Sequence, residues 1–282
     1  MWRVRPLPFG EPEIIPRVFG REIKVTFVNH STVLIQTEGL NILTDPVWAK
    51  YASPFPFLGP KRYMPAGIAF DSLPDIDLIL LTHNHYDHMD ISALSKISKK
   101  FKPQIFTTLG NTKYLEKNDI IKSFDMDWGQ TRCFSDEVSI GCVPSQHFSA
   151  RAITDRNKTL WAGFVIHTHH GDIYFAGDTG YGPCVERIRK MYPNGFRLAF
   201  LPIGAYEPKI FMQDFHSSPD EAVEMHKQLN VSQSIPIHFG TFALALDGQD
   251  DPTDELKEIL AKEENKSVRF DILLNGQTLT VK

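Results

Sequence analysis

Cysteine is scarce in this sequence, and several features that would mark a special class of protein are missing. The 282 residues include only Cys133, Cys142 and Cys184, without CxxC spacing, so no disulfide framework is indicated. No apolar run approaches the roughly 20 residues of a membrane-spanning helix, and the first 20 residues lack the continuous apolar stretch of a signal peptide. The net charge of −4 argues against a protein that coats nucleic acid. We therefore expect a cytoplasmic protein with no nucleic-acid partner.

The chain is long enough to bury a substantial core, and its pattern favours an α/β fold. Residues 1–20 are predicted to form an extended arm interrupted by prolines, and residues 21–282 to form one domain. Short β-rich runs bounded by Gly, Pro, Asn or Asp dominate the rest. Helices are predicted between them, near residues 92–100, 111–117, 184–191, 218–229 and 254–263. A layered α/β sandwich follows from this alternation.

The densest group of metal-binding side chains is the stretch LTHNHYDHMD, residues 81–90, which follows an apolar run. On an extended segment His83 and His85 point to the same side, because side chains alternate with a period of two. Asp87 and His88 follow in a turn, so they can face a second point. The HxHxDH pattern therefore predicts two groups of metal ligands.

Three further predicted strands end at a histidine or a carboxylate that is followed at once by a turn. IGCVPSQ ends at His147, IYFAG at Asp178 and SIPI at His238. In open α/β sheets, sites assemble at the rim formed by the carboxyl ends of the strands. With the HxHxDH cluster these residues make seven candidate ligands. Seven are too many for one zinc ion and suit two metal ions that share a carboxylate.

Several motifs resemble those of a known superfamily. THNHYDHMD, PSQHF, FAGDTGY and HFGTF resemble the metal-binding motifs of the metallo-β-lactamase fold superfamily. ILTDPVW, GPKRY, PSQHFSAR, FAGDTGYGP and IGAYEP closely resemble, within it, the N-acyl-phosphatidylethanolamine-hydrolysing phospholipase D family. The resemblance runs from about His30 to Leu246. It implies that residues 21–282 form an αββα sandwich, with two mixed β-sheets flanked by helices.

The resemblance also implies a centre of two zinc ions per chain. In the implied ligand set the first ion is held by His83, His85 and His147, the second by Asp87, His88 and His238, and both by the bridging Asp178. Asp87 and Asp178 would orient the attacking water during catalysis.

Three more polar residues receive roles from the resemblance. Asp45, in LTDP, resembles a group that accepts a hydrogen bond from a ligating imidazole, although it could simply cap the turn before Pro46. His30 matches a site-lining element, against the common alternative of a structural histidine. His216 is predicted to line the pocket or to donate a proton in catalysis. The HTHH stretch, residues 167–170, is interpreted as a solvated hairpin turn.

Residues 48–65, WAKYASPFPFLGPKRYMP, form a long aromatic and proline-rich stretch around Lys61, Arg62 and Tyr63. An ordinary loop packed on the sheet edge is one interpretation, but loops of this length are usually functional. An apolar wall beside basic side chains suits an acyl-chain substrate with an anionic head group. Lys61, Arg62 and Tyr63 are therefore predicted to contact the substrate.

The function implied by the resemblance is metal-dependent hydrolysis of a phosphodiester. Phospholipase D-type cleavage of N-acyl-phosphatidylethanolamine-type lipids would give phosphatidic acid and an N-acylethanolamine. A phospholipid or other phosphodiester substrate, peripheral contact with a membrane and a homodimer are the implied partners. Two alternatives stay open, namely a hydrolase of the same fold for a small soluble substrate such as a lactone or cyclic nucleotide, and a non-catalytic metal-binding protein. A β-lactamase is disfavoured because Asp178 stands where a thiolate ligand would be expected.

Overall fold

A computed structural model describes all residues, 1–282, and the chain divides into two compact units. The N-terminal unit comprises Val4–Asp127, Ser149–Trp161 and Leu273–Lys282. The C-terminal unit comprises Met1–Arg3, Trp128–Phe148 and Ala162–Ile272. Neither unit is a continuous stretch of sequence, because each combines three separate segments of the chain. None of the helices is both long and apolar enough to span a bilayer.

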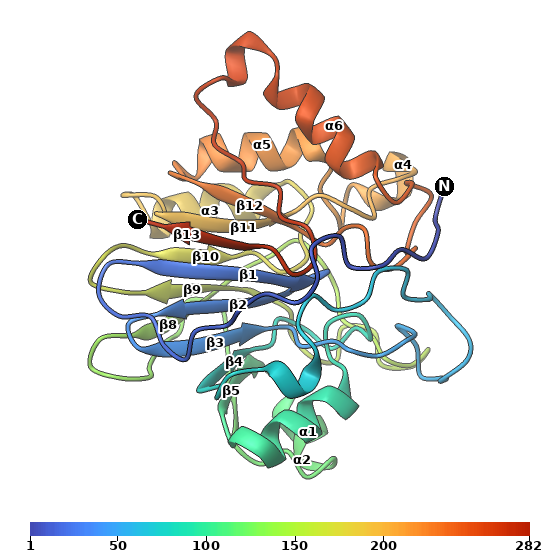
Figure 1. Cartoon of the computed structure of the whole chain (residues 1–282), viewed down its shortest axis with the longest axis vertical. Coiled ribbons are helices and arrows are strands. Elements are labelled where there is room, and N and C mark those ends of the chain that lie inside the picture. Colours follow the sequence, from blue (N-terminus) through green and yellow to red (C-terminus); the bar gives the residue numbers. More distant parts are fainter. The chain divides into compact units, whose positions relative to one another are not determined.

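A seven-stranded mixed sheet, in the order β13-β1-β2-β3-β4-β5-β6, forms the centre of the N-terminal unit (Figure 1). Its strands are β1 (Ile23–Asn29), β2 (Thr32–Thr37), β3 (Leu40–Thr44), β4 (Leu78–Leu80), β5 (Gln104–Thr108), β6 (Ser123–Met126) and β13 (Thr278–Val281). Neighbours from β13 to β3 are antiparallel, and neighbours from β3 to β6 are parallel. Strands β1, β3 and β4 therefore share one direction, and their carboxyl ends meet at the same edge of the sheet.

Two helices, α1 (Ile91–Phe101) and α2 (Thr112–Glu116), cover this sheet, together with a short 3₁₀ turn at Phe70–Ser72. Helix α1 begins at Asp90, whose side chain accepts a hydrogen bond from the amide of Ala93. Its apolar residues Leu94 and Ile97 are buried in the core beside strand residues such as Ile79 and Ile105. The amphipathic sequence of α1 thus fixes the position of the segment that precedes it, which carries the HxHxDH motif.

The C-terminal unit is built on a six-stranded mixed sheet in the order β12-β11-β10-β9-β8-β7. Its strands are β7 (Thr131–Cys133), β8 (Ser139–Val143), β9 (Gly163–His167), β10 (Ile173–Phe175), β11 (Leu198–Pro202) and β12 (Ser234–Ile237). Strands β10, β11 and β12 are parallel, whereas β9 is antiparallel to both β8 and β10. Strand β8 therefore runs in the same direction as β10, β11 and β12, and these four carboxyl ends lie at one edge.

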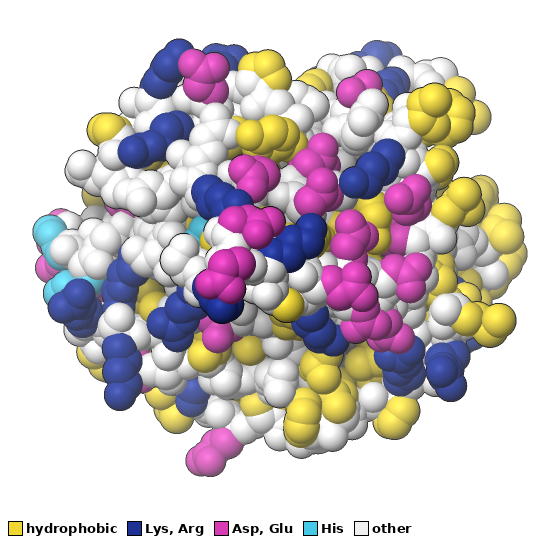
Figure 2. All heavy atoms as spheres, turned by 90° about the horizontal axis from the view of Figure 1, so that it is seen from above, with side chains coloured by type: hydrophobic (Ala, Val, Ile, Leu, Met, Phe, Trp, Pro, Cys, Tyr) yellow, Lys and Arg dark blue, Asp and Glu magenta, His cyan; other side chains and the backbone are white.

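Four helices belong to the C-terminal unit, namely α3 (Pro183–Met191), α4 (Lys209–Met212), α5 (Pro219–Gln228) and α6 (Asp251–Leu260). Helix α5 contacts α3, α6 and strand β11. It begins with a capping box. The Ser218 hydroxyl accepts a bond from the backbone amide of Glu221, and the Glu221 carboxylate accepts one from the backbone amide of Ser218. Figure 2 looks onto the molecule from the α6 side, where acidic side chains gather; α6 itself contributes Asp251, Asp254 and Glu258.

Residues 1–22 contain neither helix nor strand. The Trp2 indole donates a hydrogen bond to the Asp247 carbonyl at 2.9 Å, and Ile14 packs against the core of the N-terminal unit. Arg17 forms an ion pair with Asp77. The predicted division of the chain into an arm and one domain stays a prediction. The predicted α/β class, with two mixed β-sheets flanked by helices, is confirmed.

Candidate metal centre

The HxHxDH motif lies immediately after β4, at the edge where β1, β3 and β4 end. His83 is buried, and its Nε2 atom faces the Nδ1 atom of His85 at 2.9 Å. The two imidazole rings meet edge to face, with centroids 4.5 Å apart. Two ring nitrogens that converge in this way can be ligands of one ion.

Asp87 forms a second focus with two histidines of the same unit. Its Oδ2 atom lies 3.4 Å from Nε2 of His88 and 3.0 Å from Nε2 of His30. His30 follows β1, so it reaches Asp87 from a strand end 57 residues away in sequence. The ring centroid of His88 is 4.2 Å from that of His83, which brings the two foci close together.

Asp45 contacts His88 at Nδ1, the ring nitrogen that does not face Asp87. Its Oδ2 atom lies 2.7 Å from Nδ1 of His88, and its carboxylate also accepts bonds from the amide and hydroxyl of Thr82 at 2.8 and 2.7 Å. Next to a carboxylate, Nδ1 carries the proton, so the lone pair of His88 lies on Nε2, which faces Asp87. Burial raises the pKa of Asp45, and the attraction to His88 opposes this effect.

The C-terminal unit carries its own cluster, centred on Asp178 after β10. The Oδ2 atom of Asp178 lies 3.1 Å from Nε2 of His238, 3.6 Å from Nε2 of His147 and 3.9 Å from Nδ1 of His216. The ligand atoms of His147, Asp178 and His216 all lie within 4.8 Å of one another. A buried carboxylate oxygen among three imidazoles is an arrangement suited to a metal ligand.

Backbone contacts orient this second cluster. Nδ1 of His147 donates to the carbonyl of Phe215 at 2.9 Å, which leaves its Nε2 atom to face Asp178. The same segment carries His216, whose ring centroid is 5.0 Å from that of His147. The 213–216 turn therefore supplies one cluster member and holds another in place.

Three of the cluster residues have a left-handed backbone. The φ angles are 48° at His30, 31° at Asp45 and 62° at His238, and each residue directly follows a strand. Residues other than glycine rarely adopt this conformation, and when they do they are often at functional sites. The strand ends therefore turn sharply at the positions where the chain must present these side chains.

The predicted substrate contacts lie in the N-terminal unit, in the 48–65 loop. The Arg62 guanidinium donates to the carbonyls of Val47, Ala49 and Met64 at 2.9–3.4 Å. Burial lowers its pKa to about 10, against the opposing attraction of Asp90. These contacts hold the loop together. The ammonium of Lys61 lies 6.0 Å from the centroid of the Tyr63 ring, and the roles of all three residues in substrate binding stay predictions.

Sequence reasoning gave no role to two residues that shape the N-terminal cluster. Thr82 bonds to Asp45 and also lies 2.9 Å from Nδ1 of His83 through its hydroxyl. Arg151 donates to the carbonyls of Asn84 and Met89, on either side of the motif. The position of Arg151 in PSQHFSAR was the available signal, whereas Thr82 had none beyond its place next to His83.

The donor set fits divalent metal ions. It consists of imidazole nitrogens and carboxylate oxygens without a thiolate, and each cluster brings several of them within a few ångströms. Such donors suit zinc and also iron or manganese. The residues therefore imply divalent metal ions, while the identity and number of the ions belong to the proposal below.

Comparison with known proteins gives the family. Residues 40–239 match the model of the Beta-lactamase superfamily domain. The chain is 39% identical over 259 residues to N-acyl-phosphatidylethanolamine-hydrolyzing phospholipase D 1 of Caenorhabditis elegans, covering 87% of this chain and 72% of that protein. It is 32% identical over 243 residues to the mitochondrial N-acyl-phosphatidylethanolamine-hydrolyzing phospholipase D of Saccharomyces cerevisiae, covering 84% of this chain and 51% of that protein.

A solved structure shows the same fold. The metallo hydrolase Igni18 of Ignicoccus hospitalis matches 93% of this chain and 99% of its own with a TM-score of 0.69, at 19% identity. The family resemblance seen in the sequence motifs is thus confirmed. The chain is a metal-dependent hydrolase that belongs to the beta-lactamase superfamily and, within it, to the family of the N-acyl-phosphatidylethanolamine-hydrolyzing phospholipases D.

Proposed function

We propose that this protein hydrolyses the phosphodiester bond of N-acyl-phosphatidylethanolamine-type phospholipids at a centre of two zinc ions. The observation that carries the proposal is the Asp178 carboxylate oxygen among three imidazoles, since a buried carboxylate in such surroundings can bridge two ions. The lipid substrate is inferred from the 39% identity with a relative that bears this activity in its name.

In the proposed centre, one ion would be held by His83, His85 and His147, the other by Asp87, His88 and His238, and both by Asp178. The chemistry of these side chains supports the proposal, because imidazole nitrogens and carboxylate oxygens are common ligands of zinc.

The protein's own groups would do the following. Bound divalent ions would supply charge neutralisation for the phosphodiester and a water of lowered pKa. Asp87 and Asp178 would orient that water, since each carboxylate already faces several imidazoles. His30 would hold the Asp87 carboxylate in place, and Asp45 would hold the His88 ring in place, each through its hydrogen bond. His216 would pass a proton to the departing alcohol oxygen.

The 48–65 loop would contact the acyl chains. Phe55, Phe57 and Leu58 are 53%, 75% and 62% exposed, an unusual group of large apolar side chains on one loop. Lys61 would favour the anionic phosphate at the polar end of the lipid. Because these side chains protrude, they would also support peripheral contact with a membrane surface.

One observation favours a second candidate, a hydrolase of the same fold that acts on a small uncharged ester such as a lactone. The Arg62 guanidinium bonds to three backbone carbonyls, which leaves fewer of its donors for an anionic head group. This candidate needs no apolar surface for the substrate.

A series of dispersed phosphodiester substrates with one head group and increasing acyl length separates the two candidates. Each buried methylene contributes about 0.8 kcal/mol, so kcat/KM should rise by up to about fourfold for each carbon that contacts the loop. Phe57→Ser should flatten this dependence, and the exposed Ile121→Ser is the matched control. A kcat/KM that stays constant along the series in the wild-type protein would exclude the lipid assignment.

A further inference from the structure

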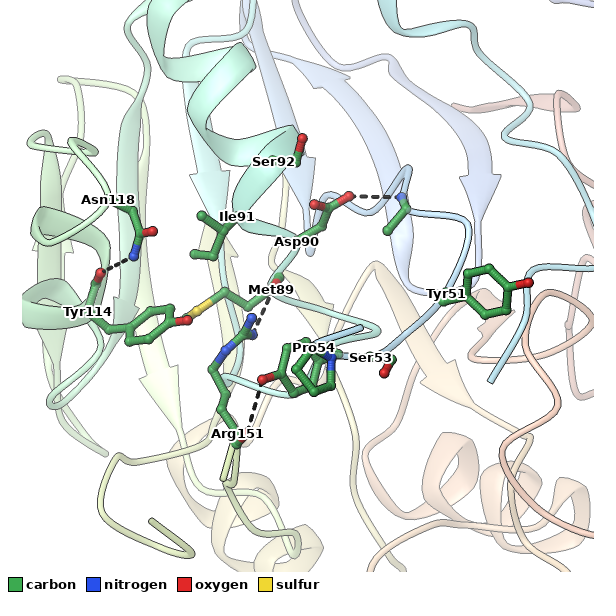
Figure 3. Close-up of a pocket in the computed structure, with 12 residues that line it drawn as sticks. Tyr51, Ser53, Pro54, Met89, Asp90, Ile91, Ser92, Tyr114, Asn118 and Arg151 are labelled. Atoms are coloured by element: carbon green, nitrogen blue, oxygen red, sulfur yellow. Dashed lines mark hydrogen bonds between the residues drawn. The ribbon is translucent and has the colours of Figure 1, made fainter. Parts of the chain in front are cut away.

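Arg151 lies between two aromatic rings beside the HxHxDH motif. Its guanidinium carbon is 3.9 Å from the centroid of the Tyr86 ring and 5.0 Å from that of Tyr114. Figure 3 shows Arg151 reaching toward Met89 and Tyr114 in a pocket of about 320 Å³. The Tyr86 hydroxyl donates back to the Arg151 carbonyl at 3.0 Å. Tyr86 stands between His85 and Asp87 in the sequence, so its ring is part of the same turn as these predicted ligands.

The Nη1 atom of Arg151 joins the two ends of the motif. It donates to the carbonyl of Asn84 at 2.7 Å and to the carbonyl of Met89 at 2.9 Å. His85, Asp87 and His88 all lie between these two carbonyls. Within the turn, the amide of Met89 donates to the carbonyl of His85 at 2.8 Å. The one cationic nitrogen therefore closes a six-residue span that carries three predicted ligands.

Arg151 is itself held on a fixed segment. Its amide and that of Ala152 both donate to Oδ1 of Asp155, at 2.9 and 2.8 Å. The Ser149 hydroxyl donates to the Thr159 carbonyl at 2.6 Å. Because the backbone on both sides of Arg151 is bonded locally, its side chain starts from a fixed point when it reaches the metal-binding turn.

We propose that Arg151 is a positioning residue for the metal centre. By holding the Asn84 and Met89 carbonyls at one point, it fixes the turn in the conformation that directs His85, Asp87 and His88 toward the ions. Lysine cannot replace it fully, because an ammonium lacks the planar group that stacks on Tyr86 while bonding to both carbonyls. The inference rests on the proposed binuclear centre.

The positive charge of Arg151 has an effect on metal binding that is opposite in sign to the effect of positioning the ligands. A cation near a dication-binding site repels the ion, so loss of the charge alone would strengthen metal binding. A positioning role predicts the reverse. The sign of the change in zinc affinity therefore tells which effect dominates.

The experiment measures zinc affinity of the metal-stripped full chain by competition with a chromophoric chelator, in the wild type, Arg151→Met, Arg151→Lys and Arg187→Met. Groups that support metal ligands typically contribute about 10–100-fold in affinity. We expect a loss in this range for Arg151→Met, a smaller loss for Arg151→Lys and none for Arg187→Met, an exposed arginine of α3. The absorption spectrum of bound Co²⁺ should change in the two Arg151 variants, which reports the ligand geometry directly.

The outcomes distinguish the two proposals. Zinc affinity of Arg151→Met equal to or above that of the wild type, with an unchanged Co²⁺ spectrum, would overturn the positioning role and leave the binuclear centre intact. A wild-type protein that binds fewer than two zinc ions would refute the centre itself. If Arg151→Met does not fold, Arg151→Lys carries the test, since it keeps the charge and most of the side-chain volume.

Discussion

Substitution of Asp45 by asparagine tests how the N-terminal cluster prepares His88 for a metal ion. Asp45 accepts three bonds, from Nδ1 of His88 and from the amide and hydroxyl of Thr82, at 2.7–2.8 Å. Asparagine has the same shape but only one accepting oxygen. Its amide group would therefore face a donor on either His88 or Thr82, and its neutral oxygen would hold the proton on Nδ1 of His88 less strongly than the carboxylate does.

The expected magnitudes differ for stability and for metal binding. Hydrogen bonds to a charged group contribute about 1.5–3 kcal/mol each, but burial, which raises the pKa of Asp45, disfavours the carboxylate. These effects oppose each other in the metal-free protein, so we expect the unfolding free energy to change by only about 1 kcal/mol. Zinc affinity should fall about 10–100-fold, which corresponds to about 1.4–2.7 kcal/mol.

The assay combines zinc competition with denaturant unfolding of the metal-free protein. Asp77→Asn is the matched control, because Asp77 also accepts bonds from a side chain, Arg17, and from a backbone amide, that of Asn41. It contacts no cluster residue through these bonds, so it should lower stability and leave zinc affinity unchanged. If Asp45→Asn binds zinc as tightly as the wild type, the orienting role inferred for Asp45 is refuted.

Further predictions concern the bridge, a buried histidine, metal removal and association. Asp178→Asn should reduce kcat by about 100-fold or more, whereas His170→Ala, in an exposed hairpin turn, should stay near wild type; similar losses in kinetic assays would show that the site is misplaced. Burial lowers the pKa of His226 to about 4, so the unfolded chain binds more protons between pH 6.5 and 4, and stability should fall as pH is lowered through this range; His226→Asn should lack this component in denaturant titrations. Chelation should abolish activity, and readdition of zinc should restore it, as a continuous hydrolysis assay would show. Light scattering should detect a homodimer, and a monomer at every concentration would exclude one.

The elements that the sequence predicted best are those with local signals. The helices predicted near residues 92–100 and 218–229 are α1 (Ile91–Phe101) and α5 (Pro219–Gln228), and the capping box at Ser218 and Glu221 places the start of α5. The strands before His83, His147 and Asp178 were also readable, because each β-rich run is followed by a polar residue and a turn, but they end three or four residues earlier than predicted, at Leu80, Val143 and Phe175. In these cases, the residues that decide the structure are neighbours in the sequence.

What the sequence did not indicate depends on distant partners. Strand β7 is exposed along its whole length and is a strand only because it pairs with β8. The contact of His30 with Asp87 joins residues 57 positions apart. Arg62 was predicted to contact the substrate, a role that stays a prediction, and nothing in the sequence indicated that three carbonyls of the folded loop also receive its donors. Such contacts form only once the tertiary structure exists.

The pairing of β1 with β13 has a consequence for synthesis of the chain on the ribosome. Ile23 pairs with Val281, so one edge of the seven-stranded sheet lacks its partner until residues 278–281 have been made. An unpaired strand edge is a site at which chains can add to one another, and contacts this distant in sequence form slowly. The nascent chain therefore carries an unpaired strand edge from the synthesis of β1 until the synthesis of β13, and an exogenous peptide that mimics residues 278–281 should pair with this edge.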